Sequence, residues 1–198
     1  MTADRTPVIE FRPLERGDLP QLRRWLTAPH VAVWWGTPPA DDAATAAKYG
    51  PLIDGDDPTE MFVFSVDRRE AGVIQRYLID DEPEWRAALA VAVDASGMAG
   101  IDYLIGEPDL VGQGIGPAMI TAFLASTFER HPGCRAVVVD VDPENRASWR
   151  ALEKAGFRRI YDGDLFDPEE DVTERTLVHR IDRGDVEPPS RPPSDAEV

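Results

Sequence analysis

The sequence has little of several features that mark other classes of protein. Of its 198 residues only Cys134 is a cysteine, which excludes an internal disulfide framework and favours a reducing, cytoplasmic location. Its three histidines are too scattered for a metal site or a catalytic triad, so we expect no metal. No apolar run approaches the length of a membrane span, and the polar stretch 1–7 does not resemble a signal peptide.

Positive charge is also scarce. There are 21 Lys and Arg residues against 37 Asp and Glu residues, which gives a net charge of −16. A surface of this kind repels nucleic acid and anionic membranes, so we expect neither as a partner, and it attracts cations. Solubility alone can explain the excess of acids. A small polycationic substrate is the more specific alternative.

The order of the predicted elements indicates an α/β fold. We expect strands at 8–14, 61–66, 72–79, 100–105, 136–141 and 176–181, and helices at 18–26, 40–49, 114–130 and 144–155. The helix at 40–49 is expected to end at Gly50-Pro51, and residues 80–98 are ambiguous. Helix 114–130 would connect two parallel strands.

The two ends of the chain differ in composition from its middle. We predict a flexible segment at 1–7, one folded domain over 8–181, and a tail at 182–198. The tail is rich in proline and acidic residues and has too few apolar side chains to fold.

Three glycines alternate just before the predicted helix at 114–130, at Gly112, Gly114 and Gly116. Backbone amides at a helix start lie at the positive end of the helix dipole and bind phosphate oxygens without any side chain. The spacing fits neither the kinase-type P-loop nor the dinucleotide fingerprint. A tight strand-to-helix turn would explain the glycines equally well, so this motif alone leaves both interpretations open.

Two longer stretches resemble one superfamily, the Gcn5-related N-acetyltransferases (GNAT). Residues 104–116, LIGEPDLVGQGIG, resemble its acetyl-CoA loop, and residues 145–157, NRASWRALEKAGF, resemble its Asn…Tyr-Glu-Lys-Gly-Phe signature. The resemblance implies a mixed, mostly antiparallel central sheet with a splayed pair of strands, flanked by helices. It also implies an N-acetyltransferase that uses acetyl-CoA as its cosubstrate.

The same resemblance implies which residues hold the donor. Strand residues Tyr103, Leu104 and Ile105 would pair with the pantetheine arm, and the amides of Leu104 and Ile105 would polarise the thioester carbonyl. Asn145 would contact the cofactor or brace its own helix. The loop residues that would cradle the pyrophosphate are Val111, Gly112, Gln113, Gly114, Ile115 and Gly116.

Within the superfamily, four features resemble the aminoglycoside 6'-N-acetyltransferases. They are the Trp34-Trp35-Gly36 stretch, the Gly100-Ile101-Asp102 stretch, Asp140 in the stretch 139–143, and Gln75 on the preceding strand. The resemblance implies direct attack by the 6'-amine of an aminoglycoside in a ternary complex, and hence antibiotic resistance.

The two aspartates and the two tryptophans of these stretches have expected roles at the acceptor. Asp102 would attract the ammonium and relay its proton, and Asp140 would hold a second amine. Trp34 and Trp35 would form a wall under a sugar ring or its ammonium, although we expect at least one of them to pack in the core.

The sequence departs from the family at two positions. Val111 stands where many members carry Arg or Gln, which removes one phosphate contact. Leu152 stands where the signature tyrosine is usually assigned to protonating the leaving CoA thiolate. With leucine there, the acid is water, another side chain or absent, and Tyr103 and Tyr161 are the candidate side chains.

Other functions remain open at this point. A siderophore-type lysine N-acyltransferase shares the Gly-Ile-Asp and Asp-Pro stretches. Leu152 also fits a weakly catalytic acyl-CoA-binding domain, and a peptide N-terminus is a further, less favoured acceptor. The protein could be a monomer or a homodimer.

Overall fold

The computed structural model describes residues 7–168 and 170–186. Within this part of the chain, seven strands form one sheet in the order β1-β2-β3-β4-β5-β7-β6. All neighbouring strands are antiparallel except β4 and β5, which are parallel. The strands are β1 Ile9–Pro13, β2 Glu60–Val66, β3 Arg69–Leu78, β4 Met98–Ile105, β5 Ala136–Val141, β6 Arg158–Asp167 and β7 Val172–Asp182. This confirms the predicted mixed, mostly antiparallel sheet.

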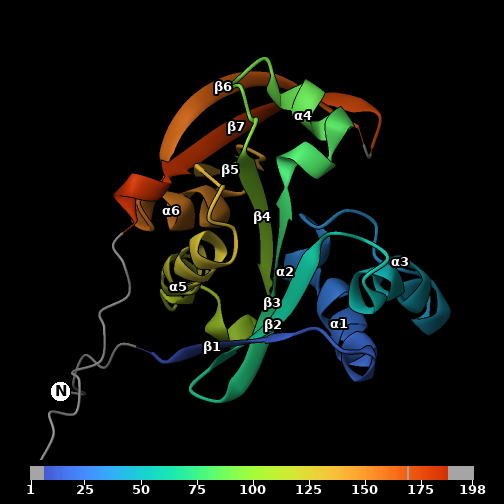
Figure 1. Ribbon diagram of the computed structural model, residues 1–198. Helices are drawn as coiled ribbons and strands as arrows, with labels where there is room; N and C mark the ends of the chain where they lie inside the picture. The colour runs from blue at the N-terminus through green and yellow to red at the C-terminus, as the bar shows by residue number, and fades with distance from the viewer. Residues whose placement is uncertain (1–6, 169, 187–198) are drawn as a thin grey trace, which may run out of the picture.

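Helices cover both faces of this sheet. Figure 1 shows α5 and α6 on one side of the central strands and α1 and α3 on the other, with α4 beside β6 and β7. The helices are α1 Leu19–Leu26, α2 Pro29–Ala32, α3 Asp42–Asp54, α4 Pro83–Leu89, α5 Ile115–Arg130 and α6 Arg146–Lys154. Leu19, Leu22 and Leu26 of α1 repeat at helical spacing and are buried, as the sequence pattern predicts.

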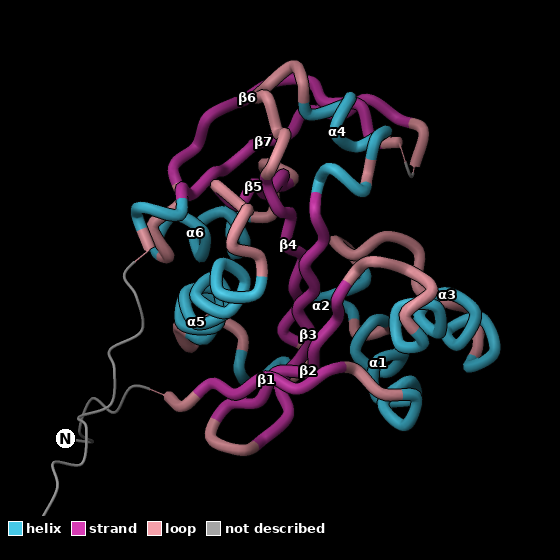
Figure 2. The backbone as a smooth tube through the Cα atoms, in the orientation of Figure 1, coloured by secondary structure: helices cyan, strands magenta, loops and turns pink. Residues whose placement is uncertain are grey.

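The parallel pair β4 and β5 separates part of the way along. Only three residue pairs join the two strands, and the last of them is Gly100 with Val138. Beyond this pair β4 continues to Ile105 and β5 to Val141 without pairing to each other (Figure 2). The predicted splayed pair of strands is therefore confirmed, and it leaves one edge of β4 open.

One predicted boundary is wrong, because α3 does not end at Gly50-Pro51. The helix continues through Pro51 to Asp54 and is closed by Gly55, which has a φ of 81° and donates its amide to the Pro51 carbonyl. Leu52 and Ile53 pack against the buried cluster under α1, so burial of these side chains outweighs the hydrogen bond that proline removes.

Two further regions differ from the sequence prediction. Strand β6 was not predicted, and its exposed charged residues hide its strand pattern, since Leu165 is its one fully buried side chain. The ambiguous region 80–98 contains α4 and a loop that leads into β4.

The described chain continues past residue 181. Strand β7 runs to Asp182, and Arg183 donates hydrogen bonds to the carbonyls of Phe128, His131 and Cys134 at 2.6–2.9 Å. The rest of the predicted tail, and most of the predicted N-terminal segment 1–7, lie outside the described residues.

Candidate active site

The two faces of the sheet around β4 carry different side chains, because alternate strand residues point to opposite faces. Ile101, Tyr103 and Ile105 belong to one large buried cluster with α5 and α6. On the other face, Leu104 belongs to a second cluster under α1 and α3, and Met98 belongs to a third cluster beside α4. The apolar core is therefore continuous on one face and interrupted on the other.

The interruption is polar. On β3 it lies between Val73 of the second cluster and Tyr77 of the third, at Gln75. On β4 it lies at Asp102, which is opposite Gln75 in the sheet register. On β5 it lies at Asp140, which follows Val138 of the third cluster on the same face. We call these three half-buried residues, Gln75, Asp102 and Asp140, the polar strip.

Gln75 and Asp102 are directly joined. The Gln75 Nε2 donates a hydrogen bond to the Asp102 Oδ2 at 2.9 Å. This bond orients the carboxylate. The sequence prediction that Gln75 and Asp102 belong to one site is consistent with this contact.

Asp102 and Asp140 flank the point where the strands separate. Asp102 follows Gly100 by two residues and Asp140 follows Val138 by two residues, and Gly100 and Val138 form the last pair. The two carboxylates therefore lie on the same face at equal offsets along two diverging strands. Both take part in interactions with neighbouring groups.

The alternation of backbone groups shows which amides face the open edge of β4. The Gly106 amide donates to the Ala71 carbonyl at 2.8 Å, so even-numbered residues of this segment direct their backbone groups at β3. The amides of Tyr103 and Ile105 then point into the gap left by β5. Of the two amides predicted to polarise a thioester, that of Leu104 faces β3 and that of Ile105 faces the gap.

The three alternating glycines have two different structural roles. Gly112 and Gly114 have φ values of 76° and 79°, and a Cβ on either would meet no atom within 4 Å. A Cβ on Gly116 would lie 3.2 Å from the Cβ of Ala151, so this glycine allows α5 and α6 to approach. The left-handed backbone at Gly112 and Gly114 shapes an open, exposed loop.

The start of α5 has the features of an anion site. Gly114 is its N-cap and provides no side-chain cap, so the first amides of this 16-residue helix have no side-chain acceptor. Gln113 is exposed beside them, and Val111 is 41% exposed without any charge to offer a phosphate. Such amides can bind a phosphate group, and the roles of the loop as a pyrophosphate cradle and of Val111 as a lost contact stay predictions.

The Glu107 carboxylate anchors the loop that precedes this cradle. Glu107 accepts hydrogen bonds from the Trp25 Nε1 at 2.8 Å and from the Arg69 guanidinium at 2.9 Å, and it also pairs with Arg24. Gly106 is needed because a Cβ there would lie 2.1 Å from the Trp25 ring. These contacts connect the end of β4 to α1 and fix the direction in which the glycine loop leaves the sheet.

The two adjacent tryptophans are in different environments. Trp35 packs against the second cluster and donates its Nε1 to the Tyr49 hydroxyl at 3.2 Å. Trp34 is 43% exposed. The expectation that at least one of them is a core residue is confirmed for Trp35. Gly36 follows them, and its Cβ position lies 3.4 Å from a carboxylate oxygen of Glu170 in the β6–β7 turn.

His30 is a residue of this region that the sequence analysis left without a role. Its Nε2 donates to the Ile105 carbonyl at 2.9 Å, so α2 is attached to the end of β4. The only signal for it in the sequence is its place just before the Trp34-Trp35 pair. The contact joins two segments that are far apart in the chain, which spacing alone does not predict.

Helix α6 contributes its first turn to this region. The Asn145 Oδ1 accepts the Ser148 amide at 3.2 Å and so caps the helix, which is the bracing role predicted for it. Its predicted contact with the cofactor stays a prediction. The Tyr103 hydroxyl lies 2.9 Å from the Ser148 Oγ, and Leu152, one turn further along, is fully buried.

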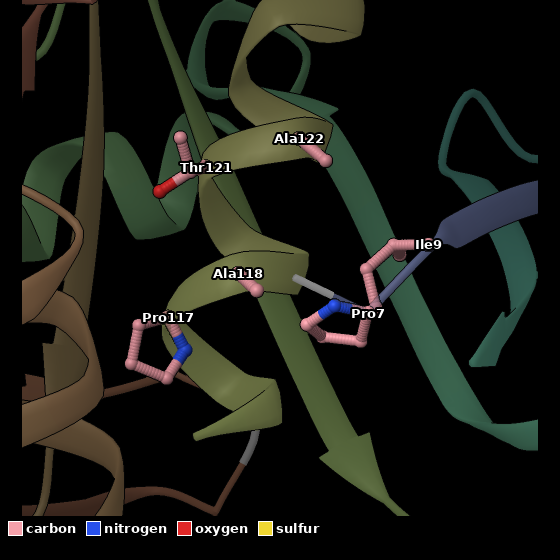
Figure 3. A pocket seen from close by; sticks show the side chains of 6 residues that line it. All are labelled: Pro7, Ile9, Pro117, Ala118, Thr121 and Ala122. Atoms are coloured by element: carbon pink, nitrogen blue, oxygen red, sulfur yellow. The ribbon is translucent and has the colours of Figure 1, made fainter. Parts of the chain in front are cut away.

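Two surface hollows lie away from the polar strip. Figure 3 shows one of about 410 Å³ between β1 and α5, lined by Pro7, Ile9, Pro117, Ala118, Thr121 and Ala122. It has no ionisable side chain, so it does not offer acid–base chemistry. Over residues 7–168 and 170–186 there is no group of three His, Cys, Asp or Glu side chains arranged to bind a metal. In the same ranges no helix is long and apolar enough to cross a membrane.

An open strand edge, a glycine loop at a helix start and a carboxylate beside the gap are features that suit an acyl-CoA-dependent transferase. A sequence model described as the acetyltransferase (GNAT) domain matches residues 15–165. The chain belongs to this family: it is an N-acetyltransferase, and acetyl-CoA is its cosubstrate.

Relatives of the chain fall into two groups. An aminoglycoside N(6')-acetyltransferase type 1 of Klebsiella pneumoniae is 25% identical over 155 residues, which cover 76% of this chain and 74% of the relative. The lysine N-acyltransferase MbtK of Mycolicibacterium paratuberculosis is 28% identical over 180 residues, covering 87% and 72%. A crystal structure of the aminoglycoside acetyltransferase AAC(6')-Ib with coenzyme A shares the fold, with a TM-score of 0.75 at 23% identity over 89% of this chain and 96% of that one.

Proposed function

We propose that this N-acetyltransferase acts on the 6'-amino group of an aminoglycoside, by direct attack in a ternary complex, and thereby confers aminoglycoside resistance. The polar strip is the observation that carries this proposal. It places two carboxylates on the face of the sheet opposite α5 and α6, beside the gap between β4 and β5. A polycationic amine fits this face better than a neutral or anionic acceptor.

The donor is held mainly by backbone groups. The amides from Gly112 to Gly116 bind the pyrophosphate, and the pantetheine arm lies in the gap along residues 103–105 in the place that a paired strand would take. The Ile105 amide donates to the thioester oxygen as negative charge develops there. Because His30 and Ala71 hold the next peptide group, this amide has a fixed direction before the donor binds.

The acceptor is held by side chains. Asp102 attracts the ammonium, takes its proton directly or through water, and returns that proton to solvent. Gln75 keeps the carboxylate oriented, and Asp140 binds a second ammonium of the same molecule. The exposed Trp34 ring forms a wall against which a sugar ring packs. The net charge of −16 speeds the encounter of the enzyme with a polycationic acceptor.

A second acceptor class has its own support. The relatives named MbtK are lysine N-acyltransferases, and the match to one of them covers more of this chain than the match to the aminoglycoside enzyme. In this alternative the polar strip binds the amine of a lysine derivative, and the acyl group is longer than acetyl. A third alternative, a weakly catalytic acyl-CoA-binding domain, follows from the buried Leu152.

The test is the release of CoA from acetyl-CoA, followed with a thiol reagent over a panel of amines. The panel contains kanamycin, tobramycin, hydroxylysine derivatives and a peptide. We expect turnover on kanamycin and none on a kanamycin analogue that lacks the 6'-amine. The Asp102→Asn variant is the matched control, because it keeps the shape of the site and removes its charge.

The other outcomes separate the alternatives. Turnover on the hydroxylysine derivatives alone, with a preference for a long-chain acyl-CoA, would replace the aminoglycoside with the lysine-type acceptor. Binding of acetyl-CoA without turnover on any amine would favour the weakly catalytic domain.

A further inference from the structure

The last step of thioester aminolysis is the departure of the CoA thiolate, and the residues of the acceptor face do not protonate it. When the C–S bond breaks, its electron pair leaves on the CoA sulfur, and a thiolate that is protonated as it departs leaves more easily. Leu152 has no proton to give, and its side chain is fully buried in the cluster with α5 and α6. A side chain that protonates the thiolate would therefore be another residue on the donor side of the gap.

Tyr103 is on that side. It belongs to the part of β4 that has separated from β5, and its side chain packs in the same cluster as Leu152. Its hydroxyl lies 2.9 Å from the Ser148 Oγ of α6. Ser148 and Leu152 are four residues apart and so share one face of this helix. Tyr103 of β4 therefore places a hydroxyl at the face of α6 that carries Leu152, which has no hydroxyl of its own.

Tyr103 also complements Asp102. Consecutive strand residues point to opposite faces of a sheet, so Asp102 faces the acceptor and Tyr103 faces the donor. The amine loses its proton on the first face, and the thiolate gains one on the second. Two adjacent residues on the open edge of β4 thus provide the two proton transfers that the reaction needs.

We propose that Tyr103 is the catalytic residue that protonates the departing CoA thiolate, with Ser148 as its positioning residue. The inference rests on the proposed acetyl transfer from acetyl-CoA, and it holds for either acceptor class because the leaving group is the same.

The step is balanced in protons and electrons. The amine nitrogen forms the new bond to the carbonyl carbon, and the C–S bond breaks with its electron pair on sulfur. The Tyr103 hydroxyl gives its proton to this sulfur, which yields the free thiol of CoA. The phenolate then regains a proton from water, and Asp102 releases the proton of the former ammonium to solvent.

The environment of Tyr103 keeps its proton in place until that moment. Burial raises the pKa of the Tyr103 hydroxyl well above its usual value, and the bond to Ser148 only partly offsets this. Either hydroxyl of the pair can donate to the other. When Ser148 donates, the proton of Tyr103 is not used in this bond, and the Ser148 carbonyl at 3.4 Å is a further acceptor for it.

Tyr161, the other candidate from the sequence, provides a matched control. Its hydroxyl donates to the Asp164 carbonyl at 2.9 Å within the edge strand β6, away from β4. Tyr161→Phe removes a tyrosine hydroxyl from the same protein without touching the open edge.

The experiment compares kcat, the KM for acetyl-CoA and the melting temperature in wild type, Tyr103→Phe, Ser148→Ala, the double variant and Tyr161→Phe. The phenylalanine keeps the ring and its packing. We expect Tyr103→Phe to lower kcat about 10²-fold with the KM for acetyl-CoA and the melting temperature nearly unchanged. Ser148→Ala should lower kcat about fivefold in wild type and have no further effect in the Tyr103→Phe background. Tyr161→Phe should match wild type.

Three results would overturn the inference. A wild-type kcat in Tyr103→Phe, with the wild type active on any amine, would remove Tyr103 from the reaction and leave the proposed function intact. An equal effect of Ser148→Ala with and without the Tyr103 hydroxyl would show that Ser148 acts through packing alone. A wild type that is inactive on every amine would instead reject the proposed function, and this inference with it.

Discussion

The two faces of the central sheet are built in different ways. The face under α5 and α6 is one continuous apolar cluster that runs from Phe64 on β2 to Ile181 on β7. The opposite face is divided into two smaller clusters, and the polar strip of Gln75, Asp102 and Asp140 lies between them. The same strands supply both faces, and alternate residues of each strand point to opposite faces. The difference therefore comes from which side chains occupy the odd and the even positions of these strands.

We infer that the two faces serve different functions, one in holding the acetyl-CoA donor and the other in binding the acceptor. On the continuous face, packing of α5 against the sheet fixes the start of this helix, which we propose binds the donor through its backbone amides. On the divided face, the polar strip interrupts the apolar packing, and we propose that its carboxylates select the acceptor. Apart from the proposed proton donor Tyr103 and its partner Ser148, substitutions on the first face should therefore act on stability and acetyl-CoA binding, and those on the second face on turnover and acceptor choice.

The strongest test of this division is at Asp102. Asp102→Ala should lower turnover on a polyamine acceptor by 10²–10⁴-fold, the usual contribution of a general base, with acetyl-CoA binding nearly intact. Its melting temperature should stay close to that of wild type, because Asp102 is half-buried between clusters and belongs to none of them. Steady-state kinetics and calorimetric titration with acetyl-CoA measure both effects. Normal turnover in this variant would reject the role of the polar strip.

The opposite behaviour is expected at Leu152. Leu152→Ala should lower the free energy of unfolding by about 2–5 kcal/mol, because it opens a cavity in the continuous cluster. Urea denaturation measures this, with Asp102→Ala as the comparison from the divided face. A loss of less than about 1 kcal/mol would mean that the donor face is less tightly packed than its burial indicates.

Features that are encoded locally were predictable from the sequence. The alternation of glycines and the signature from Asn145 to Phe157 predicted the loop, the start of α5 and all of α6. The period of two along β4 then places Asp102 and Tyr103 on opposite faces, although no pattern shows which helices cover each face.

Features that depend on distant partners were not predictable. Strand β6 is polar over most of its length and is a strand because β7 pairs with it. Helix α3 continues through Pro51 because the residues after it find a buried surface. The contacts of Tyr103 with Ser148 and of His30 with Ile105 join residues 45 and 75 positions apart, which only the fold brings together.

A smaller effect on the donor side is expected at the glycine loop. Gly114→Ala should weaken acetyl-CoA binding about 5- to 30-fold, because a side chain at a φ of 79° costs about 1–2 kcal/mol. Gly133→Ala is the matched control, since Gly133 also has open space around it but no positive φ. Titration calorimetry compares the two variants. Equal affinities would show that the loop does not need its left-handed backbone to hold the donor.

The smallest effect is expected at Glu60, which lies next to the polar strip in the strand register but on the opposite face of the sheet. Burial alone would raise the pKa of this carboxyl, but hydrogen bonds from the Arg76 Nε at 2.6 Å and the His131 Nε2 at 3.1 Å outweigh it and lower the pKa to about 2. Arg76 is itself buried and lies over the ring of Phe123 on α5, so the carboxylate supports the packing of the continuous face.

A depressed pKa stabilises the fold above the ordinary value of 4.5, and this contribution is lost as the pH falls toward 2. Glu60 is partly exposed, so solvent screening reduces the expected loss to about 1 kcal/mol between pH 5 and pH 3. Urea denaturation at these two pH values should show this loss in wild type and a smaller pH dependence in Glu60→Gln, while kcat at pH 7 stays the same in both. A parallel pH dependence in the two proteins would show that the continuous face is held by its apolar packing without help from this carboxylate.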